Sequence, residues 1–163
     1  MAFAIKGEIT GLADVFRQLR NVDKKVRNRL LKKAIRAASK LVLTSAKAKV
    51  AVRTGLLRKS LGIKVKVYRK SGIVVGIVGP RTGYKGSGKD PDENPTNIAH
   101  LVEKGRKAVM VRTKKTLSDG TTAYGREAKA VPARPFLRPA FDENKAAAEA
   151  LIRETILRGL QEQ

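Results

Sequence analysis

The sequence predicts a single α+β domain in which a long central helix and a C-terminal helix pack on a small, mainly antiparallel β-sheet. Three observations support this fold class. Residues 23–52 keep a helical spacing of apolar side chains, residues 63–78 contain two strand-like runs around a turn, and residues 139–160 repeat the helical spacing. A chain of 163 residues has the usual length of one domain, so we take residues 1–163 as one unit.

The charge balance of the chain is strongly basic. It has 36 Lys and Arg against 14 Asp and Glu, which gives a net charge of +22 at pH 7. Such a charge favours a nucleic acid, an anionic membrane surface or an acidic protein as partner. Because Cys is absent, the sequence predicts neither disulfides nor a cysteine-based metal site or nucleophile. No apolar run could span a bilayer and no signal peptide is present, so we expect synthesis in the cytoplasm and no insertion into a membrane.

The long helix is predicted from Asp23 to Val52. Asp23 suits the N-cap position because its carboxylate can accept from the free N–H groups of the first turn, and Thr54-Gly55 supplies the stop. About thirty residues give a rod of roughly 45 Å, which would cross the whole subunit. The expected apolar stripe consists of Val26, Leu30, Ala34, Ala37, Leu41, Ser45 and Ala48, widened by Leu31, Ile35, Ala38 and Val42.

The polar side of this helix is almost purely basic, and no Asp or Glu occurs from Lys24 through Lys89. An ordinary solvated helix mixes charges of both signs, whereas here like charges repel, so we expect a partner outside the chain to compensate them. The alternative is a charged face that only keeps the protein soluble. The residues predicted to face a DNA channel or an acidic partner are Lys24, Lys25, Arg27, Arg29, Lys32, Lys33, Arg36, Lys40, Lys47 and Lys49.

Shorter elements flank the long helix. Residues 1–9 indicate an edge strand or an ordered arm, and residues 12–21 indicate a short amphipathic helix. Residues 56–61 indicate a turn or the start of a strand. Residues 63–67 alternate apolar and basic side chains, and residues 73–78 are more uniformly apolar, so together they predict a β-hairpin with a more deeply buried second strand.

Two long polar loops are predicted in the second half of the chain. The first covers residues 79–95 and is rich in Gly, Pro and charged residues. The second covers residues 113–129, with a hairpin turning at Asp119-Gly120 as the alternative. A short strand over residues 108–111 precedes the second loop.

Two further helices complete the prediction. Asn97 can cap a short helix over residues 98–104, which Gly105 closes. Pro139 suits the first turn of the final helix, because its missing N–H would be unpaired there in any case. Asp142-Glu143 is expected in the same first turn, where the positive end of the helix dipole favours carboxylates.

Candidate catalytic groups are few. His100 is the only histidine, and a packed or half-exposed role on a short helix accounts for it better than catalysis. His100 and Glu103 stand three residues apart and could act as an acid–base pair, but no activated nucleophile accompanies them. We therefore predict no catalytic residues.

The first loop carries two weak ligand-like patterns. Its glycines and lysines lack the spacing and the strand–loop–helix setting of a P-loop, and its carboxylates lack an EF-hand pattern. We therefore predict no cofactor and no metal. The residues of the two patterns are Gly83, Lys85, Gly86, Gly88 and Lys89, and Asp90, Asp92 and Glu93.

Three segments resemble the small head-to-tail joining proteins of long-tailed double-stranded DNA bacteriophages, also called tail-completion or neck proteins. Residues 52–61 (VRTGLLRKSL) resemble the family's TG-x-L-r-x-S-I step after a long helix. Residues 97–105 (NIAHLVEKG) resemble its Y-A-x-x-v-E-x-G-t segment, although Lys104 replaces the usual apolar residue. Residues 132–140 (PARPFLRPA) resemble its a-x-P-F-l-r-P-A approach to a C-terminal helix.

The resemblance implies a structural role in the virion without catalysis. Members of this family form a ring, usually hexameric, between the portal–connector assembly and the tail, and double-stranded DNA passes through it. The implied partners are other copies of the chain, connector or head-closure proteins, and tail-terminator or tail-tube proteins. The motif residues with an expected structural role are Thr54, Gly55, Leu57, Ser60, Glu103, Gly105, Pro135, Phe136, Leu137 and Pro139.

Two other functions stay open from the residues alone. The charge by itself would suit a sequence-independent basic DNA-binding protein, although no zinc finger or aromatic-bearing RNA-binding motif is present. A basic ribonuclease built around His100 is the third interpretation.

Overall fold

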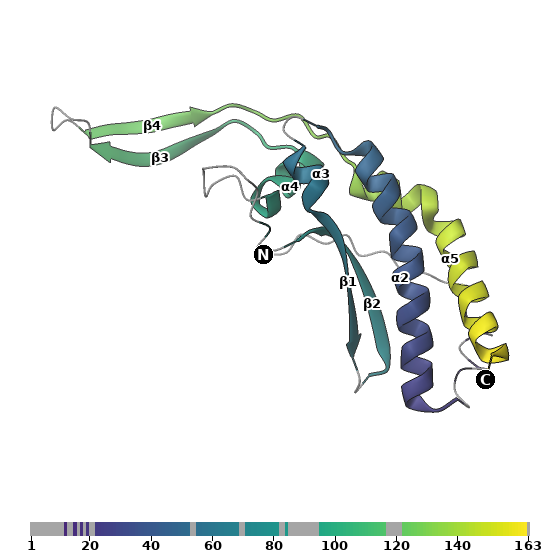
Figure 1. The fold of residues 1–163 in the computed structure, drawn as a ribbon. Helices are drawn as coiled ribbons and strands as arrows, with labels where there is room; N and C mark the ends of the chain where they lie inside the picture. The colour runs from purple at the N-terminus through teal and green to yellow at the C-terminus, as the bar shows by residue number, and fades with distance from the viewer. Residues whose placement is uncertain are drawn as a thin grey trace.

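The predicted α+β class is confirmed by a computed structural model (Figure 1), in which long helices pack beside a β-hairpin and a second two-stranded ribbon extends from them. The predicted N-terminal strand or arm and nearly all of the first polar loop lie outside the described residues. The structure describes residues 12, 15, 17, 19, 22–52, 55–68, 71–81, 84, 95–116 and 122–162.

Helix α2 is the long central helix, and it spans Lys24–Lys49. Its predicted N-cap is confirmed, because Asp23 Oδ1 accepts a hydrogen bond of 2.7 Å from the Lys25 N–H. The helix ends three residues before the predicted Val52, since the backbone of Val50 is already extended (φ −63°, ψ 131°). The helix is therefore about 39 Å long.

The two long helices run antiparallel and form the main core. Helix α5 spans Leu137–Gln161. At one end Lys49 pairs with Glu143 at 2.7 Å, and at the other end Leu30 packs against Gly159. The buried cluster between them consists of Leu30, Leu31, Ala34 and Ala38 from α2, Ala148, Ile152 and Ile156 from α5, and Leu12, Val15 and Leu19 from the preceding segment.

The predicted apolar stripe of α2 is partly wrong. Leu41 is 37% exposed and Ala48 is exposed, whereas Ser39 and Ala46 are buried. The buried arc is rotated because α2 is covered on two sides, by α5 and by the β-hairpin. A Cβ on Gly76 of the hairpin would collide with Ser39 Oγ, which shows how closely the hairpin approaches this side of α2.

The predicted hairpin is confirmed as strands β1 (Leu61–Tyr68) and β2 (Ile73–Pro80), which pair antiparallel from Leu61↔Pro80 to Tyr68↔Ile73. The prediction that the second strand is more deeply buried is wrong, because Ile73 is 55% and Val75 37% exposed on the face of the hairpin that no other described element covers. The segment before it is the short helix α3 (Leu56–Ser60), not a turn or strand start. Its first turn follows Gly55, whose positive φ of 72° turns the chain after α2.

A second ribbon accounts for much of the segment predicted as a polar loop. Strand β3 (Val109–Thr116) pairs antiparallel with strand β4 (Thr122–Ala128), so the strand expected at 108–111 continues to Thr116. This is the hairpin alternative, although its turn lies outside the described residues. The two ribbons are separate sheets, and Figure 1 shows β3–β4 extending away from the helices as an arm.

Two helix starts differ from the prediction. Helix α4 spans Pro95–Lys104, so Asn97 lies inside the helix and is not its cap. Helix α5 begins at Leu137, which puts Pro139 in the first turn as expected but moves Asp142-Glu143 into the second turn. No acidic residue of α5 itself lies in its first turn, and the compensating carboxylate comes from another helix.

Candidate functional site

The three motif segments meet in a second buried cluster, although they are far apart in the sequence. Phe136, with 0% of its surface exposed, is the centre of this cluster. Leu57 and Leu61 reach it from the first motif and Val102 from the second. The remaining members are Val42, Leu43, Ala46, Val50, Val78, Leu137, Ala140 and Phe141.

Glu103 joins the second motif to the third. Its carboxylate is buried and accepts three backbone hydrogen bonds from the start of α5: Oε2 from the N–H of Phe136 (2.8 Å) and of Leu137 (3.0 Å), and Oε1 from the N–H of Arg138 (3.0 Å). These are the free N–H groups that every helix presents at its N-terminus. A side chain of α4 therefore caps α5, and the negative charge lies at the positive end of the helix dipole.

The backbone conformation explains the two motif glycines, and a side-chain hydrogen bond explains the motif serine. Gly105 ends α4 with a φ of 72°, and a Cβ there would lie 2.8 Å from both the Ala133 nitrogen and the Val131 carbonyl oxygen. Gly55 also has a positive φ, but a Cβ there would meet nothing within 4 Å. Ser60 is fully buried, and its hydroxyl donates to the Leu57 carbonyl at 2.7 Å.

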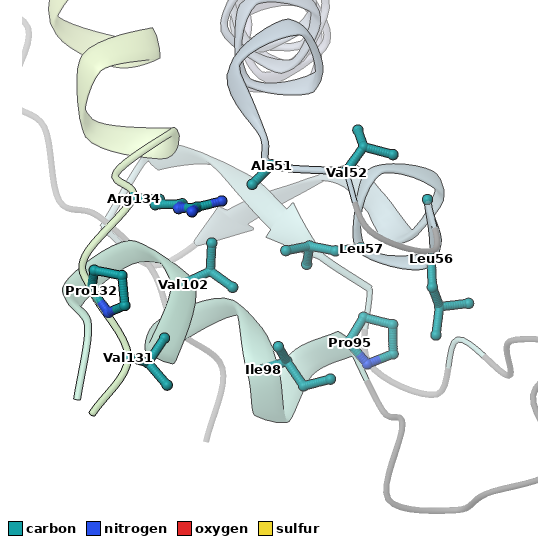
Figure 2. Close-up of a pocket in the computed structure, with 11 residues that line it drawn as sticks. Ala51, Val52, Leu56, Leu57, Pro95, Ile98, Val102, Val131, Pro132 and Arg134 are labelled. Carbon is teal, nitrogen blue, oxygen red and sulfur yellow. The ribbon is translucent and has the colours of Figure 1, made fainter. Parts of the chain in front are cut away.

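The same motif segments surround an open apolar groove of about 720 Å³ (Figure 2). One wall follows the end of α2 and α3, the second is α4, and the third is the chain between β4 and α5. Arg134 extends into the groove as its one charged lining residue among those described. The residues that line this groove are Ala51, Val52, Gly55, Leu56, Leu57, Pro95, Ile98, Val102, Val131, Pro132 and Arg134.

Several groove residues expose apolar surface. Val52 is 59% exposed, Ile98 38% and Val131 37%. Apolar side chains gathered around an open groove are typical of a surface that another protein covers. No local sequence pattern predicts this groove, because its residues come from three separated segments of the chain.

Most of the basic residues predicted on α2 form one exposed surface, which we call the basic ridge. At 100° per residue, its seven members fall within an arc of about 100° on the side away from the buried cluster. Six are exposed and Lys47 is half-buried. The ridge consists of Lys25, Arg29, Lys32, Lys33, Arg36, Lys40 and Lys47.

The other three predicted residues lie elsewhere on α2. Lys24 is the first residue of the helix, and the half-buried Arg27 lies near the turn of the first hairpin. Lys49 is occupied by its ion pair with Glu143. The structure therefore brings seven of the ten residues together as one surface.

The candidate acid–base pair is not assembled. His100 is exposed, whereas the Glu103 carboxylate is buried against the start of α5. Within the described ranges, no three His, Asp or Glu side chains gather as metal ligands. The glycine–lysine and carboxylate patterns of the first loop lie outside these ranges. None of the described helices combines the length and apolarity needed to cross a membrane.

Comparison with known proteins gives one family. Residues 13–105, more than half of the chain, match the family HK97-gp10_like, described as "Bacteriophage HK97-gp10, putative tail-component". The match contains α2, α3, the first hairpin and α4, and it ends at Gly105, so the third motif lies beyond it. No curated protein and no solved structure matches the chain.

Proposed function

The chain belongs to the HK97-gp10-like family of bacteriophage tail components, and we propose that it is the neck subunit that joins the head to the tail. As a tail component it is a structural virion protein that contacts other virion proteins. In the proposed role it acts without catalysis. Copies of the chain form a ring, hexameric by the family resemblance, between the connector or head-closure proteins and the tail-terminator or tail-tube proteins, and double-stranded DNA passes through it.

The family match is the observation that carries this proposal, and the apolar groove supports it. The motifs that carry the resemblance to neck proteins frame a solvent-exposed apolar groove. We assign the groove to the neighbouring subunit of the ring. A ring repeats the same contact at every subunit, so it covers an apolar surface that each copy would otherwise expose to water.

In this role the seven residues of the basic ridge form the surface that faces the DNA channel or an acidic neighbouring ring. The described motif residues contribute by shape: Gly55 redirects the chain after α2, and Pro135 and Pro139 direct it into α5. Glu103 and Phe136 hold α4 against α5.

Electron cryomicroscopy of the intact particle tests the proposal. The expected result is a symmetric ring of this chain in the neck, with neighbouring copies in contact at the groove. A particle whose neck lacks the chain, or heads and tails that join normally in its absence, would contradict the proposal. The alternative, a free basic DNA-binding protein, would then be preferred.

A further inference from the structure

We propose that the basic ridge of α2 binds the phosphate backbone of duplex DNA, in preference to an acidic protein. The inference rests on the proposed function only for the source of the duplex, which is the genome passing through the neck. The binding surface itself is defined by residues of the described structure.

The composition of the ridge is the first argument. Eight positions of α2 between Lys25 and Lys47 fall within its arc, and Leu43 is the only one that is not Lys or Arg. Leu43 is half-buried and packs against the cluster around Phe136. The ridge therefore presents cationic side chains without an apolar centre.

This composition distinguishes between the two partners. Protein–protein interfaces have a centre depleted in Lys and enriched in aromatic and apolar residues, with charges at the rim. Protein–DNA interfaces are much more positively charged, and Lys and Arg supply many of their phosphate contacts. Of the large apolar side chains that are exposed in the described part of the chain, most lie at the groove (Val52, Ile98, Val131) or on the first hairpin (Tyr68, Ile73, Val75), and none belongs to the ridge.

The lack of internal compensation is the second argument. Within the described part of the chain, no carboxylate pairs with a ridge residue. Helix α5 differs, because Arg158 pairs with Glu154 at 2.6 Å and Arg138 lies 4.0 Å from Asp142. Among the described residues, basic side chains of α5 thus have carboxylate partners on their own helix, whereas the ridge residues of α2 have none.

The dimensions of the ridge are the third argument. Lys25 and Lys47 are 22 residues apart, which corresponds to about 33 Å along a helix. One turn of B-form DNA is about 34 Å long. Arg29, Lys33, Arg36 and Lys40 form the central line of the ridge, with roughly 5–6 Å between neighbours. The ridge can therefore follow a duplex over one turn by charge alone, without reading its sequence.

The test compares two purified full-length variants of equal net charge. The ridge variant is R29Q/K33Q/R36Q/K40Q, in which Gln keeps a helix propensity similar to that of Lys and Arg. The control variant is R58Q/K59Q/K64Q/K66Q, which removes four exposed charges from α3 and β1. Each variant carries four positive charges fewer than the wild-type protein. Affinity for a random-sequence duplex of about 36 base pairs is measured as a function of salt concentration.

The expected result is specific to the ridge. Its variant should lower the slope of log K against log salt by about 3 to 4, because each lost phosphate contact contributes about 0.9. The loss of affinity between 50 and 200 mM salt should then be about 150-fold smaller than in the wild type. The control variant should change the slope by less than about one. The ridge variant should unfold at no lower urea concentration than the wild type, because it relieves repulsion between like charges.

Two outcomes would overturn the inference. An equal loss of duplex affinity in both variants would mean that net charge alone attracts DNA. A ridge variant that binds the duplex normally but no longer binds polyglutamate would assign the ridge to an acidic protein. Wild-type protein present in the neck but without ridge-dependent DNA binding refutes this inference alone. Ridge-dependent DNA binding by a protein absent from the neck refutes the proposed function alone.

Discussion

The Glu103 carboxylate accepts a hydrogen bond of 2.8 Å from the backbone N–H of Phe136, 33 residues later in the chain. The whole β3–β4 arm lies between these two residues. Between these two residues, at the base of the arm, the backbones of Arg106 and Val131 exchange two hydrogen bonds, each 2.8 Å long. The two chain segments at the base of the arm, which we call the arm root, are therefore held together by two sets of hydrogen bonds. One set is made by the Glu103 side chain and the other by the backbones of Arg106 and Val131.

Replacing Glu103 by Ala should destabilise the fold by about 3 to 5 kcal/mol, because three N–H groups at the buried start of α5 would lose their charged acceptor. E103Q should lower the free energy of unfolding by less than E103A, since the Gln amide oxygen can still accept hydrogen bonds from the N–H groups at the start of α5. Urea unfolding should show a lower midpoint with an unchanged m-value. The matched control is E154A, which removes an exposed carboxylate paired with Arg158 and should cost less than about 1 kcal/mol. Equal effects of E103A and E154A would contradict the capping role.

Alanine substitutions at Gly105 and Gly55 should differ in cost, although both glycines have a φ of 72°. G55A should lower the free energy of unfolding by about 1–2 kcal/mol. A Cβ at this position meets no neighbouring atom, so the left-handed backbone conformation is the only unfavourable contribution. G105A should cost clearly more, since its Cβ would also lie 2.8 Å from backbone atoms of Val131 and Ala133. Thermal or urea unfolding of the two variants measures the difference. If G105A were no more destabilising than G55A, the close packing of the arm root against α4 would be wrong.

Shortening the arm should leave the body of the protein folded. The change joins Arg106 to Val131 through an Asn-Gly turn, which suits two residues that already face each other in an antiparallel pair. We expect the free energy of unfolding to change by less than about 1–2 kcal/mol, because the side chains described at the two ends of the arm, those of residues 107–109 and 129–130, are exposed. Circular dichroism and urea unfolding test this expectation. A shortened chain that no longer folds would mean that the arm is part of the core.

The elements that the sequence predicted well depend on neighbours in the chain. The α2 helix, its Asp23 cap and the β1–β2 hairpin follow from the 3.6-residue and two-residue spacing of apolar side chains and from local turn residues. The end of α4 at Gly105 was predictable for the same reason, because a left-handed residue after a helix favours Gly.

The features that the sequence does not predict depend on contacts between distant segments. Local rules predict Asp142-Glu143 in the first turn of α5, but the negative charge at that position comes from Glu103 on α4. Similarly, Ser39 is buried because the hairpin covers a second side of α2, and the periodicity of α2 alone carries no information about that second neighbour. The basic ridge was predictable in large part, because it lies on a single helix.

Substituting Ile98 by Lys should separate assembly from folding. Ile98 lines the groove and is 38% exposed, so the isolated subunit should tolerate the change with a loss of less than about 1 kcal/mol. In the assembled ring the new ammonium group would be buried beside Arg134, where unpaired like charges cost several kcal/mol. Each 1.4 kcal/mol corresponds to a factor of about ten in association, so the yield of joined particles should fall by at least about tenfold.

The measurement supplies the variant in trans to phage that lack the gene and counts infectious particles, with the soluble variant examined by thermal unfolding. H100K is the control, because His100 is exposed on the same helix, does not line the groove, and gains the same charge. A normal yield with I98K would remove the groove from the subunit contact. A low yield with both variants would indicate that α4 tolerates no added charge at all. A low yield with I98K alone, from a folded protein, is the result that the proposed ring requires.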